Sequence, residues 1–155
     1  MNIKLNNFMV IYYDPFNDHH YQNATQISKD STIVKYLGKT NPKEWNRSYL
    51  QNLLLYLIED KQQCIGVLAI DSYKQETKVI TTLVYGLLEQ YQDKGLGSMF
   101  LEQLSTYLID DQEVQEIRLF IDKENIPSIC IARKNGFQKK ENSSCYVKQK
   151  ILIKK

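Results

Sequence analysis

"YQDKGLGSMFLEQL", residues 91–104, places two glycines at the start of a predicted amphipathic helix. Apolar side chains recur there at the three- and four-residue spacing of one helix face: Leu96, Phe100, Leu101, Leu104, Tyr107 and Leu108. The first N–H groups of a helix lack backbone acceptors and attract anions. Gly95 and Gly97, with Lys94 before and Ser98 after them, therefore predict a phosphate or pyrophosphate site.

Two common nucleotide motifs do not fit this loop. The P-loop requires G-x-x-x-x-G-K-[ST], and no Lys-Ser or Lys-Thr pair follows a glycine at that distance. The dinucleotide fingerprint G-x-G-x-x-G requires a third glycine where this chain has Phe100. A plain turn that contains two glycines remains the other interpretation.

The hydrophobic pattern alternates between the strand period and the helix period. Strands are predicted at residues 8–13, 53–59, 64–70, 78–88, 116–122 and 145–153, with a further short strand around 137–140. The polar residues 60–63 predict a hairpin turn between the second and third of these strands. Helices are predicted at residues 17–29, 31–37, 96–108 and 126–135, and one more within 40–52, capped by Asn41 with Pro42 at its first position. Asp30 is the predicted cap of helix 31–37, and Gly38 is its predicted C-terminal stop. This order predicts a single α/β layer sandwich.

Composition excludes several classes of protein. The 155 residues fit one domain, and a net charge of +2 without blocks of like charge leaves no footprint for nucleic acid or a membrane surface. The three cysteines show no C-x-x-C spacing, so neither a disulfide framework nor a zinc site is indicated. No apolar run approaches the length of a membrane span, and we expect a cytoplasmic protein without a metal.

A second motif gives the loop its context. Gln92-x-x-Gly95-x-Gly97 follows a predicted central strand, and "NIPSICIARKNGF", residues 125–137, comes about 30 residues later. Together they resemble the GNAT superfamily of acetyl-CoA-dependent N-acetyltransferases. The N-x-x-S spacing and the final "ARKNGF" are especially similar to the branch that acetylates ribosomal-protein N-termini.

The resemblance implies a GNAT fold in one N-acetyltransferase domain over residues 1–155. Its mixed central sheet of six to seven strands would be flanked by helices, and the family's fourth and fifth strands, here 78–88 and 116–122, would splay to admit the cofactor. The implied division is an acceptor-side half at about 1–77, an acetyl-CoA-binding core at about 78–137 and closing strands at 138–155.

The resemblance also implies which residues hold acetyl-CoA as cosubstrate. The loop would bind the pyrophosphate through backbone N–H groups, the end of strand 78–88 would pair with the pantetheine arm, and the Asn125 side chain would bond the same arm. The cofactor-binding residues implied are Gly86, Leu87, Leu88, Gln92, Asp93, Lys94, Gly95, Leu96, Gly97, Ser98 and Asn125.

The chemistry requires a neutral amine, a donor to the oxyanion and a proton for the departing thiolate. A lysine-type amine of pKa about 10.4 is neutral in about one part in several thousand at pH 7. The family's usual oxyanion donor is a strand N–H, here near Leu87 or Leu88. Many members protonate the thiolate with a tyrosine seven residues after the asparagine, where this chain has Ala132. Ser128 is the candidate general acid; alternatively, its hydroxyl bonds its own helix backbone.

The general base is not assigned by the sequence. Family members often place an acid on one of two strands, at positions that hold Thr81 and Phe120 here. A water chain, an acid from another element such as Glu89, or solvent alone remain open. The neighbours His19 and His20 point about 100° apart on a helix and do not share one metal easily.

Two functions from different classes follow. The first is an N-acetyltransferase that acts by direct attack in a ternary complex on a primary amine, either a protein N-terminus or a small amine. The second is an acyl-CoA-binding sensor or interaction module with little catalysis. The acceptor pocket is expected near Tyr12, Tyr13 and Tyr21, and a homodimer through the C-terminal strands is an arrangement that recurs in the family.

Overall fold

The structure, a computed structural model, describes residues 2–46 and 53–151. Its strands are β1 (Ile3–Lys4), β2 (Met9–Tyr12), β3 (Leu53–Asp60), β4 (Gln63–Gln75), β5 (Lys78–Leu87), β6 (Glu116–Phe120), β7 (Gln138–Lys139) and β8 (Cys145–Gln149). Its helices are α1 (Asp18–Lys29), α2 (Ser31–Leu37), α3 (Leu96–Thr106) and α4 (Ile126–Lys134), with a 3-10 turn η1 (Glu89–Tyr91) and a π-helical turn η2 (Tyr107–Asp111). Across the described residues, no helix combines the length and the apolar character needed to cross a bilayer.

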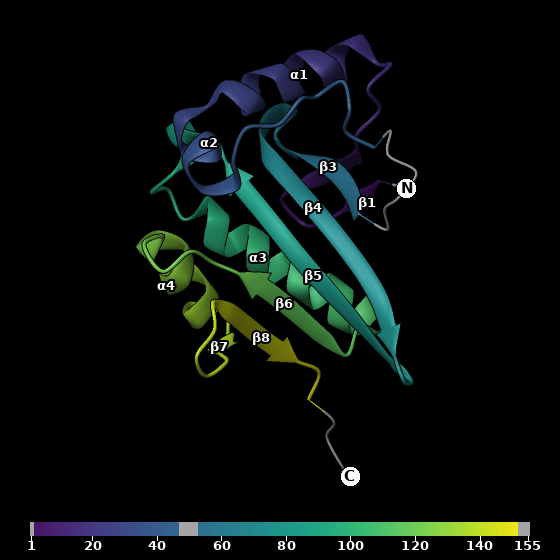
Figure 1. The fold of residues 1–155 in the computed structure, drawn as a ribbon. Helices are drawn as coiled ribbons and strands as arrows, with labels where there is room; N and C mark the ends of the chain where they lie inside the picture. The colour runs from purple at the N-terminus through teal and green to yellow at the C-terminus, as the bar shows by residue number, and fades with distance from the viewer. Residues whose placement is uncertain (1, 47–52, 152–155) are drawn as a thin grey trace.

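The strands form one mixed sheet in the order β1-β2-β3-β4-β5-β6-β8-β7. β5 and β6 run parallel, whereas the other neighbouring pairs are antiparallel. Helices α1 and α2 cover one face at one end of the sheet, and α3 lies across the other face with α4 beside it (Figure 1). The predicted α/β layer sandwich is confirmed.

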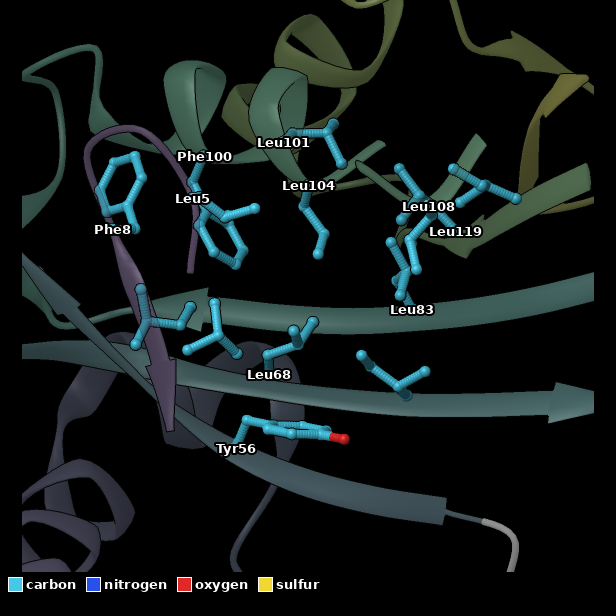
Figure 2. Packing of buried hydrophobic residues seen from close by; sticks show 14 of the residues in the cluster. Leu5, Phe8, Tyr56, Leu68, Leu83, Phe100, Leu101, Leu104, Leu108 and Leu119 are labelled. Carbon is cyan, nitrogen blue, oxygen red and sulfur yellow. The ribbon is translucent and has the colours of Figure 1, made fainter. Parts of the chain in front are cut away.

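The larger part of the core lies between α3 and the sheet (Figure 2). Phe100, Leu101 and Leu104 of α3 are fully buried, as the predicted apolar stripe requires. The facing side chains come from the sheet, with Leu68 and Leu83 among them (Figure 2). A smaller cluster packs α1 and α2 against the opposite face. Both faces of the central strands are therefore covered, which accounts for their nearly continuous apolar sequence.

Helix α2 begins and ends where the sequence predicts. The Asp30 side chain caps it by accepting hydrogen bonds from the N–H groups of Thr32 (3.0 Å) and Ile33 (3.2 Å). Gly38 follows the last turn with φ at 84°, a conformation that favours glycine. Because both ends are fixed, α2 holds one position over the end of β5.

Two expectations from the sequence are corrected. The sheet has eight strands rather than six to seven, because the two residues of β1 are too short to give a period-two pattern. The helix predicted within 40–52 is wrong in its described part: residues 42–46 form turns, and Asn46 has φ at 60°, which no right-handed helix contains. The remainder of that predicted helix lies outside the described residues.

The parallel pair β5–β6 separates part-way along its length. Pairing runs from Ile80 opposite Glu116 to Leu83 opposite Leu119 and then stops. β5 continues to Leu87, paired only with β4 on its other side. Within the described chain, the last four residues of β5 therefore keep one edge without a partner strand, and this is the predicted splay.

An ion pair on β6 makes stability depend on acid pH. Burial alone would raise the pKa of Glu116, but hydrogen bonds from Gln149 and Arg118 and the charge of Arg118 outweigh it and lower this pKa. A depressed folded-state pKa adds stability above the unfolded value, about 4.3, and this stability is lost as the pH falls through the folded value. We expect Glu116→Gln to flatten the fall of the free energy of unfolding below about pH 4.3, measured by urea titration across pH. The exposed Glu102→Gln is the control, and an unchanged slope in Glu116→Gln would contradict the assignment.

Candidate functional site

Three cavities surround the open edge of β5. The loop cavity, of about 260 Å³, lies between α2, the end of β5, η1 and the start of α4. The gap cavity, of about 50 Å³, lies where β5 and β6 separate. The α2 cavity, of about 660 Å³, lies on the face covered by α1 and α2. Ile33 and Leu37 line both the α2 cavity and the loop cavity. Leu37 and Val84 line both the α2 cavity and the gap cavity. Because the cavities share these residues, all three meet at the same end of β5.

The direction of the β5 backbone groups distinguishes the three positions expected to pair with an incoming arm. The Leu88 N–H donates to the Ile65 carbonyl on the β4 side (2.8 Å), so its neighbour Leu87 presents its N–H and carbonyl to the gap. The same alternation turns Gly86 toward β4 and Tyr85 toward the gap. Of the three positions predicted to pair with an incoming arm, Leu87 alone has that direction.

Gln92 fixes the start of the loop. Its side-chain amide donates to the Leu87 carbonyl (2.8 Å), which ties the loop to the end of β5. The predicted residue is therefore placed beside the open edge, but the structure gives its side chain an intramolecular role. Asp93 follows with φ at 59°, and exposed Lys94 places its ammonium 6.0 Å from the centre of the Tyr91 ring.

The two glycines of the loop serve different purposes. Gly95 precedes α3 with φ at 77°, and a Cβ there would meet nothing within 4 Å. Gly97 is buried, and a Cβ there would lie 3.1 Å from Cδ1 of Ile131 on α4. Gly95 therefore permits the turn and leaves open space beside it, and Gly97 permits close packing of α3 and α4. The first-turn N–H groups of α3, from Leu96 to Ser98, have no acceptor inside the helix.

Asn125 and Ser128 meet at the start of α4, and both line the gap cavity. The side-chain oxygen Oδ1 of Asn125 caps the helix by accepting from the Ser128 N–H (3.4 Å). Within residues 2–46 and 53–151, the Ser128 hydroxyl makes no hydrogen bond, so the alternative of a bond to its own helix backbone is not observed. Ala132 is fully buried and cannot be replaced by a tyrosine without repacking.

The acids near the gap are few. Thr81 is fully buried and its hydroxyl is bonded to Ser72 (2.9 Å), whereas Phe120 is 56% exposed. The Glu89 carboxylate accepts from the Ser31 hydroxyl (2.8 Å). Asp122, which sequence reasoning missed, lines the gap cavity, and one of its oxygens accepts from a neighbouring backbone N–H. Its position just after a strand was the sequence signal that could have identified it as a site residue.

A carboxylate joins α2 to the loop. Oδ2 of Asp30 accepts from the Glu89 N–H (3.0 Å) while Oδ1 caps α2. Sequence reasoning found the cap and missed this second contact, because the partner lies 59 residues away. The contact is helped by Gly86: a Cβ there would lie 2.7 Å from Cδ1 of Ile33 and 2.9 Å from Cδ1 of Leu37. Asp30 and Gly86 thus bring α2 against the end of β5.

The other polar groups singled out by sequence lie elsewhere. Tyr13 is fully buried and donates to the Pro42 carbonyl, so it supports the α2 cavity without lining it. His20 accepts from the Asp14 N–H. Burial raises the pKa of the Cys145 thiol, which favours the inert thiol over a nucleophile. Within the described ranges, no group of three or more His, Cys, Asp or Glu side chains is placed to hold a metal ion.

Comparison with known proteins gives this geometry a family. The profile of the acetyltransferase (GNAT) domain matches residues 11–138. The chain belongs to the GNAT family. As a member it is an acetyl-CoA-dependent acetyltransferase, and the predicted GNAT fold is confirmed. None of the curated proteins matches this GNAT sequence.

Solved GNAT structures share the fold at low sequence identity. An acetyltransferase of the GNAT family from Bacillus anthracis is 15% identical with a TM-score of 0.76, over 97% of this chain and 99% of that one. RimL, a ribosomal alpha-N-protein acetyltransferase in complex with coenzyme A, is 17% identical with a TM-score of 0.72, over 96% and 98%. An aminoglycoside acetyltransferase in complex with coenzyme A is 17% identical with a TM-score of 0.74, over 92% and 94%.

Proposed function

We propose that this GNAT protein transfers the acetyl group of acetyl-CoA to a primary amine, carried by a protein N-terminus or a small molecule, by direct attack in a ternary complex. The observation that carries the proposal is the unpaired edge of β5, which leads directly into a loop and a helix N-terminus. An extended arm with an anionic end matches both parts, and coenzyme A has that form.

The cofactor would lie along this edge. The pyrophosphate would accept hydrogen bonds from backbone N–H groups between Asp93 and Ser98, where the helix dipole favours negative charge. The pantetheine arm would accept from the N–H of Leu87, whose carbonyl already accepts from Gln92, and the amide nitrogen of Asn125 would bond the same arm. Exposed Lys94 adds a nearby cation.

The oxyanion donor lies deeper in the gap than Leu87 and Leu88. The arm enters beside the loop and runs toward Leu83, where the gap closes, so the thioester would lie beyond Leu87. Tyr85 is the next residue whose N–H faces the gap. The Tyr85 N–H is therefore proposed to bond the oxyanion. The Tyr85 ring packs against Phe100 of α3 (ring centres 5.8 Å apart), and this burial raises the pKa of its phenol.

The reaction would proceed in two steps, formation and collapse of a tetrahedral intermediate. The nitrogen lone pair of the neutral amine attacks the thioester carbon, the C–N bond forms, and the carbonyl electrons move to the oxygen as the oxyanion. Collapse of this intermediate breaks the C–S bond, and the thiolate leaves. The Ser128 hydroxyl would donate a proton to this sulfur and regain one from solvent, while the extra N–H proton of the amide leaves to water or to Asp122.

The acceptor would enter from the face of the sheet covered by α1 and α2. The proposed division keeps residues 1–77 as the acceptor-side half, 78–137 as the cofactor core and 138–155 as closing strands, in one domain over 1–155. The α2 cavity lies on the acceptor side and reaches the gap through Val84. RimL and the aminoglycoside enzyme show that this fold serves both protein and small-molecule acceptors.

The first test is calorimetric titration with acetyl-CoA beside a thiol-release assay on amines and N-terminal peptides. Micromolar binding with turnover would support the transferase. Binding without turnover on any amine would favour the alternative function, an acyl-CoA-binding sensor, which the missing tyrosine at Ala132 supports. Absence of acetyl-CoA binding would contradict both.

The Asp30 contact predicts a measurable link between α2 and the cofactor loop. Asp30→Asn keeps the oxygen that caps α2 but places an NH₂ group against the Glu89 N–H. A hydrogen bond to a charged group contributes about 1.5 kcal/mol, so the Kd of acetyl-CoA is expected to rise by up to about tenfold. Asn17→Ala, which removes the cap of α1, should leave this Kd unchanged. Equal Kd values in wild type and Asp30→Asn would refute the link.

A further inference from the structure

The α2 cavity has walls from separate parts of the chain. Its floor is formed by strands β3 to β5, and its sides by the end of α1, by α2 and by the loop after α2: Ile27, Ile33, Leu37, Gly38, Lys39, Thr40, Asn41, Glu44, Trp45, Asn46, Leu55, Val67, Ala69 and Val84. Its volume of about 660 Å³ lies in the range of small-molecule sites. The reacting amine of any occupant would reach the gap past Val84.

The charge of this cavity is small and balanced. The floor residues Leu55, Val67, Ala69 and Val84 are all apolar. Among the described lining residues, Lys39 and Glu44 are the charged pair, and both are exposed on the loop after α2. An acceptor with several ammonium groups would bury more positive charge than Glu44, beside Lys39, can balance, and burial of an unbalanced charge is unfavourable. The cavity therefore matches one ammonium group on an apolar body.

The outer wall is held by specific contacts. The Trp45 ring packs edge-on against the Tyr13 ring at 5.1 Å, and the Tyr13 hydroxyl donates to the Pro42 carbonyl (2.8 Å). The Asn46 side chain donates to the carbonyls of Tyr13 and Leu55 and accepts from the Leu55 N–H, each at 2.9 Å. These bonds fix the wall before any ligand arrives, so the cavity has a shape that can select by size.

An apolar cavity also favours deprotonation of the acceptor amine, which matters here because β5 has Thr81 where family members often place an acid. Removal of water disfavours the charged form of an amine, so an acceptor bound on an apolar floor loses its proton to solvent more readily. Buried Thr81 cannot accept that proton as a carboxylate would. A single amine on an apolar body is the acceptor that gains most from this environment.

We propose that the acceptor is a small apolar monoamine, with one primary amine on an aromatic or branched aliphatic body that fills the α2 cavity over Ala69 and Val84. The inference rests on the proposed acetyl transfer and names its acceptor class. Exposed Glu44, one of the lining residues, would attract the ammonium before it loses its proton.

Binding is measured before catalysis, by calorimetric titration of the protein with and without coenzyme A. The probes are phenethylamine, kanamycin and a tetrapeptide with an N-terminal phenylalanine. We expect phenethylamine to bind at least tenfold more tightly than kanamycin and more tightly than the tetrapeptide. Tighter binding of kanamycin would overturn the proposal, and tighter binding of the tetrapeptide would overturn it in favour of a protein N-terminus.

A variant of the floor locates the site. Ala69→Leu adds three carbons above the floor and should weaken phenethylamine binding at least tenfold, while the Kd of acetyl-CoA stays unchanged. Ala69→Ser, of nearly the same volume, is the matched control and should change phenethylamine binding less than threefold. Unchanged phenethylamine binding in Ala69→Leu would overturn the assignment.

Results that contradict the acetyl transfer differ from results that contradict the acceptor class. Absence of acetyl-CoA binding, or binding of both ligands without turnover, would contradict the transferase. Phenethylamine binding that Ala69→Leu abolishes would still support the apolar monoamine as the ligand of the α2 cavity. The two results therefore separate the acceptor class from the chemistry.

Discussion

Replacement of Ser128 by alanine is expected to lower kcat for acetyl transfer about 100-fold and to leave the Kd of acetyl-CoA unchanged. The hydroxyl lines the gap cavity and makes no hydrogen bond within the described residues. A proton donor assists the thiolate only as the C–S bond breaks, so its loss affects the chemical step and spares binding. The factor lies at the lower end for general acids because a thiolate is already a fair leaving group.

Two further variants separate a role of Ser128 as proton donor from a structural role. Ser128→Thr keeps a hydroxyl and should recover a part of kcat that Ser128→Ala loses. Cys130→Ala, an exposed position on the same helix, should leave kcat and the melting temperature unchanged. The measurements are steady-state thiol release and calorimetry. An unchanged kcat in Ser128→Ala would show that another group, or solvent, protonates the sulfur.

Gly95→Val is expected to raise the Kd of acetyl-CoA at least tenfold. Glycine at this position has φ at 77°, and a β-branched residue there is a steric outlier. The left-handed conformation costs an L-residue about 1–2 kcal/mol, so the loop would relax and move its N–H groups away from the anion. A tenfold loss in affinity corresponds to about 1.4 kcal/mol, which is within that strain.

Gly136→Val is the matched control for Gly95→Val. Gly136 has φ at 86° and follows the C-terminal end of α4, where an added Cβ would make an ordinary contact of 3.8 Å with Lys148. Both variants should lose similar stability in thermal unfolding, whereas only Gly95→Val should lose affinity in calorimetry. If the two variants bind acetyl-CoA equally well, the loop does not hold the pyrophosphate.

Local signals in the sequence predicted much of the fold. The apolar stripe of α3, the Asp30 cap of α2 and the turn between β3 and β4 each depend on neighbouring residues, and all three are confirmed. The helix predicted within 40–52 is wrong in its described part, where Asn46 adopts a left-handed φ and its side chain donates to the carbonyls of Leu55 and of Tyr13, 33 residues away in the chain. A contact over such a sequence distance leaves no local pattern.

The site was predictable only in part, for the same reason. The glycine spacing and Gln92 located the loop, but which side of β5 faces the gap depends on its pairing with β4, seen in the bond from Leu88 to Ile65. The second contact of Asp30 and the walls of the α2 cavity join segments far apart in the chain. The spacing of residues along the sequence does not show which distant segments meet in space.

The open edge of β5 offers main-chain groups rather than side chains to its ligand. A main-chain N–H survives every substitution except proline, so the identity of residues such as Tyr85 and Leu87 can drift as long as they fill the core. Family members can therefore diverge to the 14–17% identity seen among the solved relatives and keep the same cradle. What relatives must preserve at this site is therefore the pairing of one strand, which β6 leaves part-way along, more than the identity of the side chains on it.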